Sequence, residues 1–398
     1  MPRIHFANRR GQQLAGTVEL PAGGEWRATA LFAHCFTCGR NLKAARHITR
    51  ALADAGYAVL RFDFTGLGES EGDFADTSFS SNLDDLEDAA QWLQDTLAPP
   101  QLLVGHSLGG TACLAVAERL PSVRAIATLA APASPAHVLK QLDTDLDAIA
   151  RDGESSVTLA GRDFRIRNDF VQDARAHDLA PRLRRLRRAL LVLHGPRDSV
   201  VSIDQAQEIF TAALHPKSFM SLDDADHLLS ERADAVYAAQ VIASWAMRFL
   251  ELQAPAPERH VRVSGRTADG FLCSVQAGAH QGLADEPASA GGTDRGPDPY
   301  QHLASALAAC TVMTLNMYGR HKQLPLERVS CTVEHRKIHA KDCEDCETRA
   351  GRVDEFTRRI QLEGELDQAQ RDRLLEIADR CPVHRTLEGE VRIRSELA

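Results

Sequence analysis

The chain has 398 residues, of which 44% are hydrophobic and 25% charged, and its formal net charge is −9. This length exceeds one typical domain, so two domains are expected. The acidic balance argues against a nucleic-acid partner, which usually needs a basic surface. No segment has the pattern of a signal peptide or of a membrane span. Nine cysteines in so large a chain favour a reducing, cytoplasmic compartment.

The first 22 residues predict a β-hairpin, because Ile4 and Phe6 alternate before a turn at Asn8 to Gly11. Short apolar runs then recur between helical segments, which is typical of buried parallel strands in a βαβ sheet. The runs are Ala28–His34, Ala58–Phe62, Leu102–His106, Ala125–Ala130, Ala189–His194 and Lys217–Leu222. A helix from about Ala233 to Leu250 follows. These elements predict an α/β domain over residues 1–254, with a lid-like insertion at about 133–188.

A linker is predicted at residues 255–259, because Pro255 and Pro257 favour an extended chain. Beyond it the pattern changes to alternating strands of an antiparallel sheet and two helices, which predicts an α+β domain over residues 260–398. The expected strands are Val261–Ser264, Phe271–Gln276, Val329–His335, Phe356–Leu362 and Val391–Ile393. The expected helices are Tyr300–Lys322, with Leu303, Leu307, Cys310, Thr314 and Met317 on one stripe, and Asp367–Arg380.

A Gly-x-Ser-x-Gly motif lies at residues 105–109, with Ser107 at its centre. It follows a predicted strand and opens a predicted helix, which is the context that a nucleophile elbow requires. The elbow exposes the hydroxyl of Ser107 at a helix N-terminus, where the dipole favours developing negative charge. This context makes Ser107 the candidate nucleophile.

A serine hydroxyl needs a base, and the base needs an orienting carboxylate. Asp198 follows the strand that ends at His194, and His227 follows the last strand of the sheet. The order Ser, Asp, His and the positions beyond strand ends match the α/β-hydrolase arrangement. We therefore predict a Ser107–Asp198–His227 triad. The competing residues are His106, His194, Asp224 and Asp226, none of which lies at the expected place in the order.

The oxyanion hole is expected to combine the backbone N–H of Leu108 with that of Phe36, in the loop after an early strand. Two neighbours of Phe36, Cys35 and Cys38, form a Cys-x-x-Cys pair. The pair has a metal or redox interpretation, but its place on this loop favours lining the substrate site. The basic run at residues 182–188 is interpreted as a solvated helix face, with recognition of an anionic substrate group as the alternative.

The second domain resembles the OsmC/Ohr family, whose members reduce organic hydroperoxides with two cysteines. The resemblance covers nearly all of residues 260–398 and rests above all on Ala308–Thr314 and Ile377–Leu387. It implies that Cys310 is the peroxidatic thiol, oxidised to a sulfenic acid, and that Cys381 is the resolving thiol. It also implies that the chain forms a homodimer or a higher oligomer through residues 260–398, with the thiol sites at the interface. The order of an α/β-hydrolase followed by an OsmC-like domain, and the residues Ala33–Cys38, resemble a bacterial fusion family.

Two features of the family need a counterpart here, because an attacking thiol must be ionised. Arg266 is the candidate for the activating arginine. Tyr300 stands where the family has a glutamate, and Glu286 or Asp298 is the candidate replacement. The Cys343-x-x-Cys346 pair is interpreted as a loop feature, with a metal site as the alternative. Cys113, Cys273 and Cys331 are interpreted as core residues.

We therefore expect a serine hydrolase of the carboxylesterase type, acting on small acyl esters, fused to a thiol-dependent organic hydroperoxide reductase that uses a dithiol reductant. No metal or cofactor is predicted, and no nucleic-acid or membrane partner. In one alternative the OsmC-like domain is mainly a module for dimerisation and substrate binding, and the protein is only an esterase. In another the peroxidase is the main activity.

Overall fold

The structure is a computed structural model that describes residues 3–36, 38–142, 146–159, 162–252, 259–339 and 351–397. The chain divides into two compact units. The first unit comprises Met1–Asp269 together with Gln276–His280, and the second comprises Gly270–Val275 together with Gln281–Ala398.

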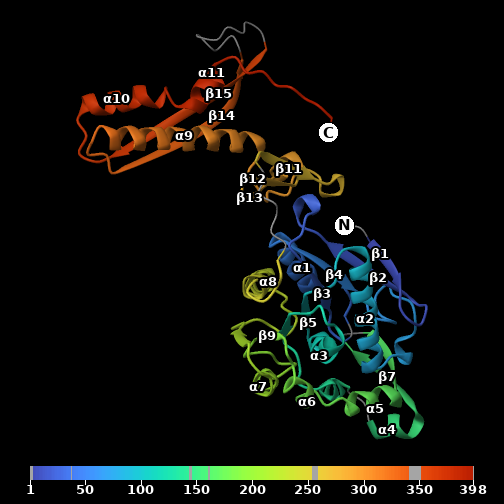
Figure 1. Ribbon diagram of the computed structural model, residues 1–398. Coiled ribbons are helices and arrows are strands. Elements are labelled where there is room, and N and C mark those ends of the chain that lie inside the picture. Colours follow the sequence, from blue (N-terminus) through green and yellow to red (C-terminus); the bar gives the residue numbers. More distant parts are fainter. Residues whose placement is uncertain are drawn as a thin grey trace. The chain divides into compact units, whose positions relative to one another are not determined.

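An eight-stranded sheet forms the centre of the first unit, in the order β1-β2-β4-β3-β5-β6-β9-β10 (Figure 1). β1 (Arg3–Ala7) and β2 (Gln13–Glu19) form the predicted hairpin, and β2 also pairs antiparallel with β4 (Tyr57–Phe62). All other neighbouring strands are parallel. They are β3 (Ala28–Ala33), β5 (Leu102–His106), β6 (Ala125–Leu129), β9 (Ala189–His194) and β10 (Lys217–Ser221). The mostly parallel sheet predicted from the sequence is therefore confirmed.

Helices cover both faces of this sheet. α1 (Lys43–Asp54) and α8 (Arg232–Ala246) contact one another on one face, and α2 (Phe79–Thr96) and α3 (Leu108–Val116) do so on the other (Figure 1). Side chains alternate along each strand, so β3 contributes Leu31 to one buried core and Phe32 to the other. Because helices cover these central strands on both faces, their sequences are continuous apolar runs.

Between β6 and β9 the chain forms several short elements. A β-hairpin of β7 (Glu154–Leu159) and β8 (Arg162–Arg167) is followed by α5 (Asn168–Ala176) and α6 (Ala180–Leu183). The 3-10 helix η4 (Pro135–Gln141) and α4 (Leu146–Asp152) precede that hairpin. α7 (Ile203–Ala212) then connects β9 to β10.

In the second unit the long helix α9 (Pro299–His321) packs along a hairpin of β14 (Arg328–His339) and β15 (Arg352–Glu363) (Figure 1). α10 (Gln368–Ala378) and the short α11 (Pro382–Glu388) also contact α9. The buried core here is small and consists of Leu315, Val329, Leu374, Ile377 and Ala378. A three-stranded sheet of β11 (Val261–Gly265), β12 (Cys273–Ala277) and β13 (His280–Ala284) contains the point where the two units divide.

One strand expected in the second unit is absent, and two of its helices differ in detail from the expectation. Val391–Ile393 form no strand, and the side chain of Ile393 is 87% exposed. Of the apolar stripe predicted on α9, Leu307 is buried, whereas Met317 is 67% exposed; Thr311, outside the stripe, is fully buried. The helix predicted over Asp367–Arg380 is α10, which ends before Cys381 as expected. A separate short helix, α11, begins at Pro382, since a proline at the first helical position costs no hydrogen bond.

Candidate active site

Ser107 occupies the sharp turn between β5 and α3. Its backbone has φ 54° and ψ −127°, a left-handed conformation that a non-glycine residue adopts only when its surroundings enforce it. Part of the enforcement comes from Gly109, where a Cβ atom would lie 2.4 Å from the carbonyl oxygens of Ala33 and His34. The turn can therefore press directly against the end of β3.

His227 lies between Ser107 and Asp198. Its Nε2 atom is 3.1 Å from the hydroxyl oxygen of Ser107, and its Nδ1 atom is 2.7 Å from Oδ2 of Asp198. All three side chains are buried. The structure thus brings together the three residues predicted as a triad, in the geometry of a nucleophile, a base and an orienting carboxylate.

The carboxylate of Asp198 is held from both sides. Oδ1 accepts hydrogen bonds from the backbone N–H groups of Val200 and Val201, while Oδ2 accepts the bond from His227. Burial alone would raise the pKa of Asp198, but the hydrogen bonds from His227 and the two backbone groups outweigh it and lower that pKa. The carboxylate therefore stays ionised beside the imidazole.

His106 and His194, the two histidines that competed with His227, bond to backbone carbonyls next to the site. Nε2 of His106 lies 2.6 Å from the backbone carbonyl of His227, and Nε2 of His194 lies 2.7 Å from that of Val201. Burial lowers the pKa of both imidazoles, to about 4 for His106. Asp226 and Asp224 are engaged elsewhere, with the backbone N–H of Ser230 and the side chain of Arg197.

The two candidate oxyanion donors lie on neighbouring strand ends. β3 and β5 pair in parallel with Ala33 opposite Gly105, so the Phe36 loop and the Ser107 turn leave the sheet side by side. Leu108 is the first residue of α3, and N–H groups in the first turn of a helix lack intrahelical acceptors. A turn closed by a 3.3 Å hydrogen bond from Cys38 N to Cys35 O surrounds Phe36.

Cys35 and Cys38 are joined by a disulfide bond, which favours the redox interpretation of this pair over the metal interpretation. Between them, the ring of Phe36 packs against Phe74 and Phe170, with centroid distances of 5.4 and 5.2 Å. Phe170 belongs to α5, and Phe74 also contacts Phe164 on β8. The loop after β3 is therefore packed against the chain between β6 and β9.

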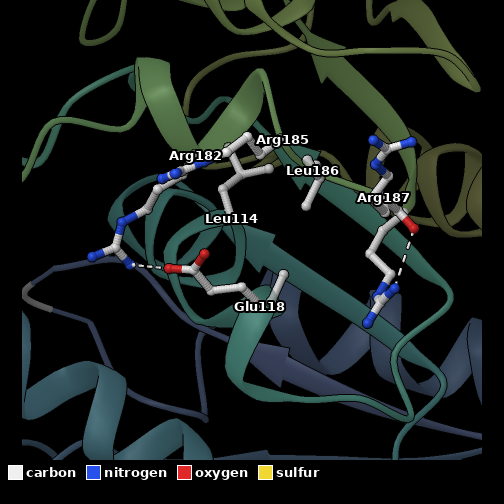
Figure 2. A pocket seen from close by; sticks show the side chains of 8 residues that line it. Leu114, Glu118, Arg182, Arg185, Leu186 and Arg187 are labelled. Carbon is white, nitrogen blue, oxygen red and sulfur yellow. Dashed lines mark hydrogen bonds and ion pairs between the residues drawn. The ribbon is translucent and has the colours of Figure 1, made fainter.

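The basic run lies away from Ser107. Arg182, Arg185, Arg187 and Arg188 line a pocket at the C-terminal end of α3, together with Leu114 and Glu118 (Figure 2). Arg182 donates to the backbone carbonyl of Ala115 and pairs with Glu118 at 3.3 Å. Cations at a helix C-terminus oppose the partial negative charge of its free carbonyls. The contacts of Arg182 thus explain part of the run as a helix cap.

In the second unit the two predicted thiols are both free. Cys310 is half-buried on α9 and lines an open, mostly apolar cavity with Ala306, Met313 and Pro382 among its neighbours. Cys381 is fully buried, and its sulfur accepts hydrogen bonds from His384 N at 3.3 Å and from the Thr311 hydroxyl at 3.8 Å. Because Pro382 follows Cys381 directly, one cavity adjoins both cysteine segments.

Arg358, on β15, is a residue that sequence reasoning missed. Its guanidinium donates to the Thr311 hydroxyl and the Ala378 carbonyl, both at 3.0 Å, and pairs with Asp379 at 2.7 Å. The positive charge of Arg358 therefore lies next to Thr311, whose hydroxyl contacts the sulfur of Cys381. Nothing in an alternating strand distinguishes an inward arginine from a solvated one, so the sequence carried no signal for it.

Arg266 and Asp298, two of the residues expected to activate the thiol, have other partners, as does Tyr300 at the place of the family glutamate. Arg266 forms an ion pair with Asp269 within the first unit. Asp298 caps α9 by accepting from the backbone N–H of Gln301. Tyr300 stacks on His335 with a centroid distance of 4.1 Å. Cys113 is buried as expected, whereas Cys273 and Cys331 are only half-buried; the Cys343–Cys346 pair lies outside the described residues.

The fold of the first unit, with Ser107, His227 and Asp198 brought together beyond its strand ends, defines its class as an enzyme of the α/β-hydrolase fold. Comparisons with known proteins agree. A family model described as the alpha/beta hydrolase fold matches residues 31–152, and one described as OsmC-like protein matches residues 292–396. The chain therefore belongs to the α/β-hydrolase fold family and continues into an OsmC-like domain.

Among solved structures, the esterase domain of a Rhodothermus marinus protein is 47% identical, with a TM-score of 0.53. The match covers 62% of this chain and 98% of that domain. The palmitoyl-protein thioesterase ABHD10 of mouse is 29% identical over 45% of this chain, and the match spans 62% of its length. The Escherichia coli K12 protein YfhR is 24% identical over 60% of this chain and 78% of its own. Among the described residues, no helix combines the length and apolar character needed to cross a membrane.

Proposed function

We propose that the first unit is a carboxylesterase that hydrolyses small acyl esters through an acyl-enzyme. The observation that carries the proposal is the position of His227, within hydrogen-bond reach of both Ser107 and Asp198. The similarity to the esterase domain of the Rhodothermus marinus protein supports it. The relatives named palmitoyl-protein thioesterase make acyl thioesters a second substrate class to test.

In the proposed reaction His227 removes the proton of Ser107 as the hydroxyl attacks the acyl carbonyl. The N–H groups of Leu108 and Phe36 stabilise the oxyanion, and Asp198 stabilises the imidazolium that forms. His227 then gives its proton to the leaving alcohol. Water, activated in the same way, releases the acid and restores Ser107.

Turnover of p-nitrophenyl acetate and butyrate tests this proposal. Ser107→Ala should lower kcat by at least about 1000-fold, because removing the nucleophile leaves only binding and the oxyanion donors. Ser122→Ala is a matched control, since Ser122 bonds to the Pro100 carbonyl beyond the end of α3. If the Ser107 variant hydrolyses these esters as fast as the wild-type protein, the esterase assignment is wrong.

We propose that the second unit reduces organic hydroperoxides. The half-buried Cys310 beside an apolar cavity supports this, because the cavity suits the organic part of such a substrate. The Cys310 thiolate attacks the peroxide, the O–O bond breaks, and an alcohol leaves with a proton. The resulting sulfenic acid condenses with the Cys381 thiol to a disulfide and water, and a dithiol reductant restores both thiols. We propose a cytoplasmic setting, where dithiols are supplied.

Consumption of cumene hydroperoxide in the presence of a dithiol tests the second activity. Cys310→Ser should abolish it, whereas Cys273→Ser should not, because Cys273 lies outside the cavity. If the wild-type protein consumes no hydroperoxide, the alternative holds and the OsmC-like unit serves dimerisation and substrate binding. If only hydroperoxide is turned over, the peroxidase is the main activity.

We also propose a homodimer that forms through α9. The side chains of Met313 and Met317 are 69% and 67% exposed on this helix, and Leu303 is 36% exposed. Exposed apolar side chains gathered on one helix are typical of an interaction surface. The same surface borders Cys310, so a partner copy would complete the walls of the open cavity.

A further inference from the structure

The disulfide between Cys35 and Cys38 spans the loop that carries Phe36. We propose that it is a second redox site of this chain: a dithiol reductant opens it, and its opening slows acyl transfer at Ser107. The inference rests on the proposed esterase function and on Phe36 as an oxyanion donor. It assigns to the Cys-x-x-Cys pair a reaction of its own, separate from that of Cys310 and Cys381.

The loop is anchored on both sides of the disulfide. Before it, the carbonyls of Ala33 and His34 press against Gly109 of the elbow, where no Cβ atom would fit. After it, Arg40 is 1% exposed, and its backbone N–H and guanidinium both bond to Asp63. Between these anchors lies the disulfide itself, which joins Cys35 to Cys38 on either side of Phe36. Its removal therefore affects the position of Phe36 more than the rest of the sheet.

Phe36 links the disulfide to two parts of the acyl site. Its backbone N–H is the proposed second oxyanion donor, whose position must be correct to within a few tenths of an ångström. Its ring packs against Phe170 of α5 and Phe74 of η2 (Phe74–Asp76). A looser loop would displace the donor and weaken the contact with the segment between β6 and β9. Both changes act on the transition state or on water exclusion, so we expect kcat to fall.

The two sulfurs differ in access. Cys35 is 6% exposed, whereas Cys38 is only half-buried. An incoming thiolate can therefore attack the sulfur of Cys38, which forms a mixed disulfide and releases the Cys35 thiolate, and Cys35 then takes up a proton. The second thiol of the reductant displaces Cys38. The products are two protein thiols and one oxidised reductant, so two electrons and two protons have moved to the protein.

The experiment compares oxidised and dithiothreitol-reduced full-length protein in the hydrolysis of p-nitrophenyl butyrate, with iodoacetamide labelling and mass spectrometry to measure the state of Cys35 and Cys38. Reduction should lower kcat by about tenfold or more, less than the 100- to 1000-fold typical of complete loss of an oxyanion donor. KM should change little, since the donor acts mainly in the transition state. Reoxidation should restore the rate.

Variants separate this site from the other thiols. Cys35→Ser/Cys38→Ser should show the low rate with and without reductant, whereas Cys273→Ser should keep the full response of the wild-type protein. An unchanged kcat while labelling shows both cysteines free would overturn the inference and leave the esterase assignment intact. The same holds if oxidised protein contains no Cys35–Cys38 bond. Absence of ester turnover in either state would instead remove the proposed function itself.

Discussion

His106 shows how a side chain outside the proposed triad can determine the position of His227, the proposed base. It is fully buried behind Ser107, its ring lies 5.2 Å from that of His227, and its Nε2–H reaches the backbone carbonyl of His227. Burial, reinforced by the nearby His227, lowers its pKa to about 4. At neutral pH it is therefore an uncharged donor that holds the loop carrying His227, the proposed base.

This low pKa makes stability depend on pH in a defined window. In the unfolded chain His106 binds a proton below about 6.5, whereas in the folded chain it does so only below about 4. Between these values the unfolded state binds more protons, so the free energy of unfolding decreases as the pH falls, by about 1 kcal/mol per pH unit. Above about 6.5 the contribution is fully present.

Urea unfolding of wild type and His106→Gln at several pH values between 4 and 7 measures this contribution. The amide of glutamine can still donate to the His227 carbonyl but does not titrate. We expect the wild-type protein to lose stability relative to the variant as the pH falls through this window. A stability difference that is the same at all pH values would contradict the assigned pKa.

Some residues of the two sites could be predicted from the sequence and others could not. Ser107, Asp198 and His227 were predictable because each follows a strand end, and strand ends of a parallel sheet converge. The bond between Cys35 and Cys38 was not predicted, since the same spacing suits a metal, a dithiol or a disulfide. Arg358 was invisible because its role depends on which face of β15 meets α10 and α11.

At the scale of elements, the elbow depends on close contact between α3 and β3. A Cβ atom at position 109 would lie 2.4 Å from two backbone carbonyl oxygens, which cannot move without shifting the strand. We expect Gly109→Ala to cost about 1–3 kcal/mol of stability and to remove most ester hydrolysis, because Ser107 and the Phe36 loop would separate. Thermal unfolding and p-nitrophenyl butyrate turnover measure the two effects.

Gly282→Ala is the matched control for this substitution, because a Cβ atom there meets nothing within 4 Å. It should leave both the unfolding temperature and ester turnover near their wild-type values. Full activity of Gly109→Ala would mean that the strand end yields more easily than its contacts indicate.

Buried elements were the easiest to predict. The parallel strands have boundaries within one residue of those expected, because a strand covered on both faces has an uninterrupted apolar run. Elements with one buried face and one exposed face were harder to predict. The stripe predicted on α9 contains Leu307, which is buried, but also Met317, which is exposed, and the buried face of the helix continues through Thr311 and Leu315. An apolar face toward the core and one toward a partner have the same helical period.

At the scale of the whole molecule, the exposed side of α9 carries the proposed dimer. Introducing charge there with Met313→Glu/Met317→Glu should shift the protein from dimer to monomer in light scattering coupled to gel filtration. Leu214→Glu is the matched control, because Leu214 is also exposed, at 46%, but lies in the first unit. A double variant that stays dimeric would exclude this face.

The second unit has a small core, so the two proposed activities should respond differently when the protein is diluted. The first unit has two extensive buried clusters of its own, whereas the described core of the second contains only a handful of side chains. Stability that is supplied by a partner copy falls as protein concentration falls. As the protein is diluted, the rate of hydroperoxide consumption per chain should therefore fall first, while the rate of ester hydrolysis per chain stays the same.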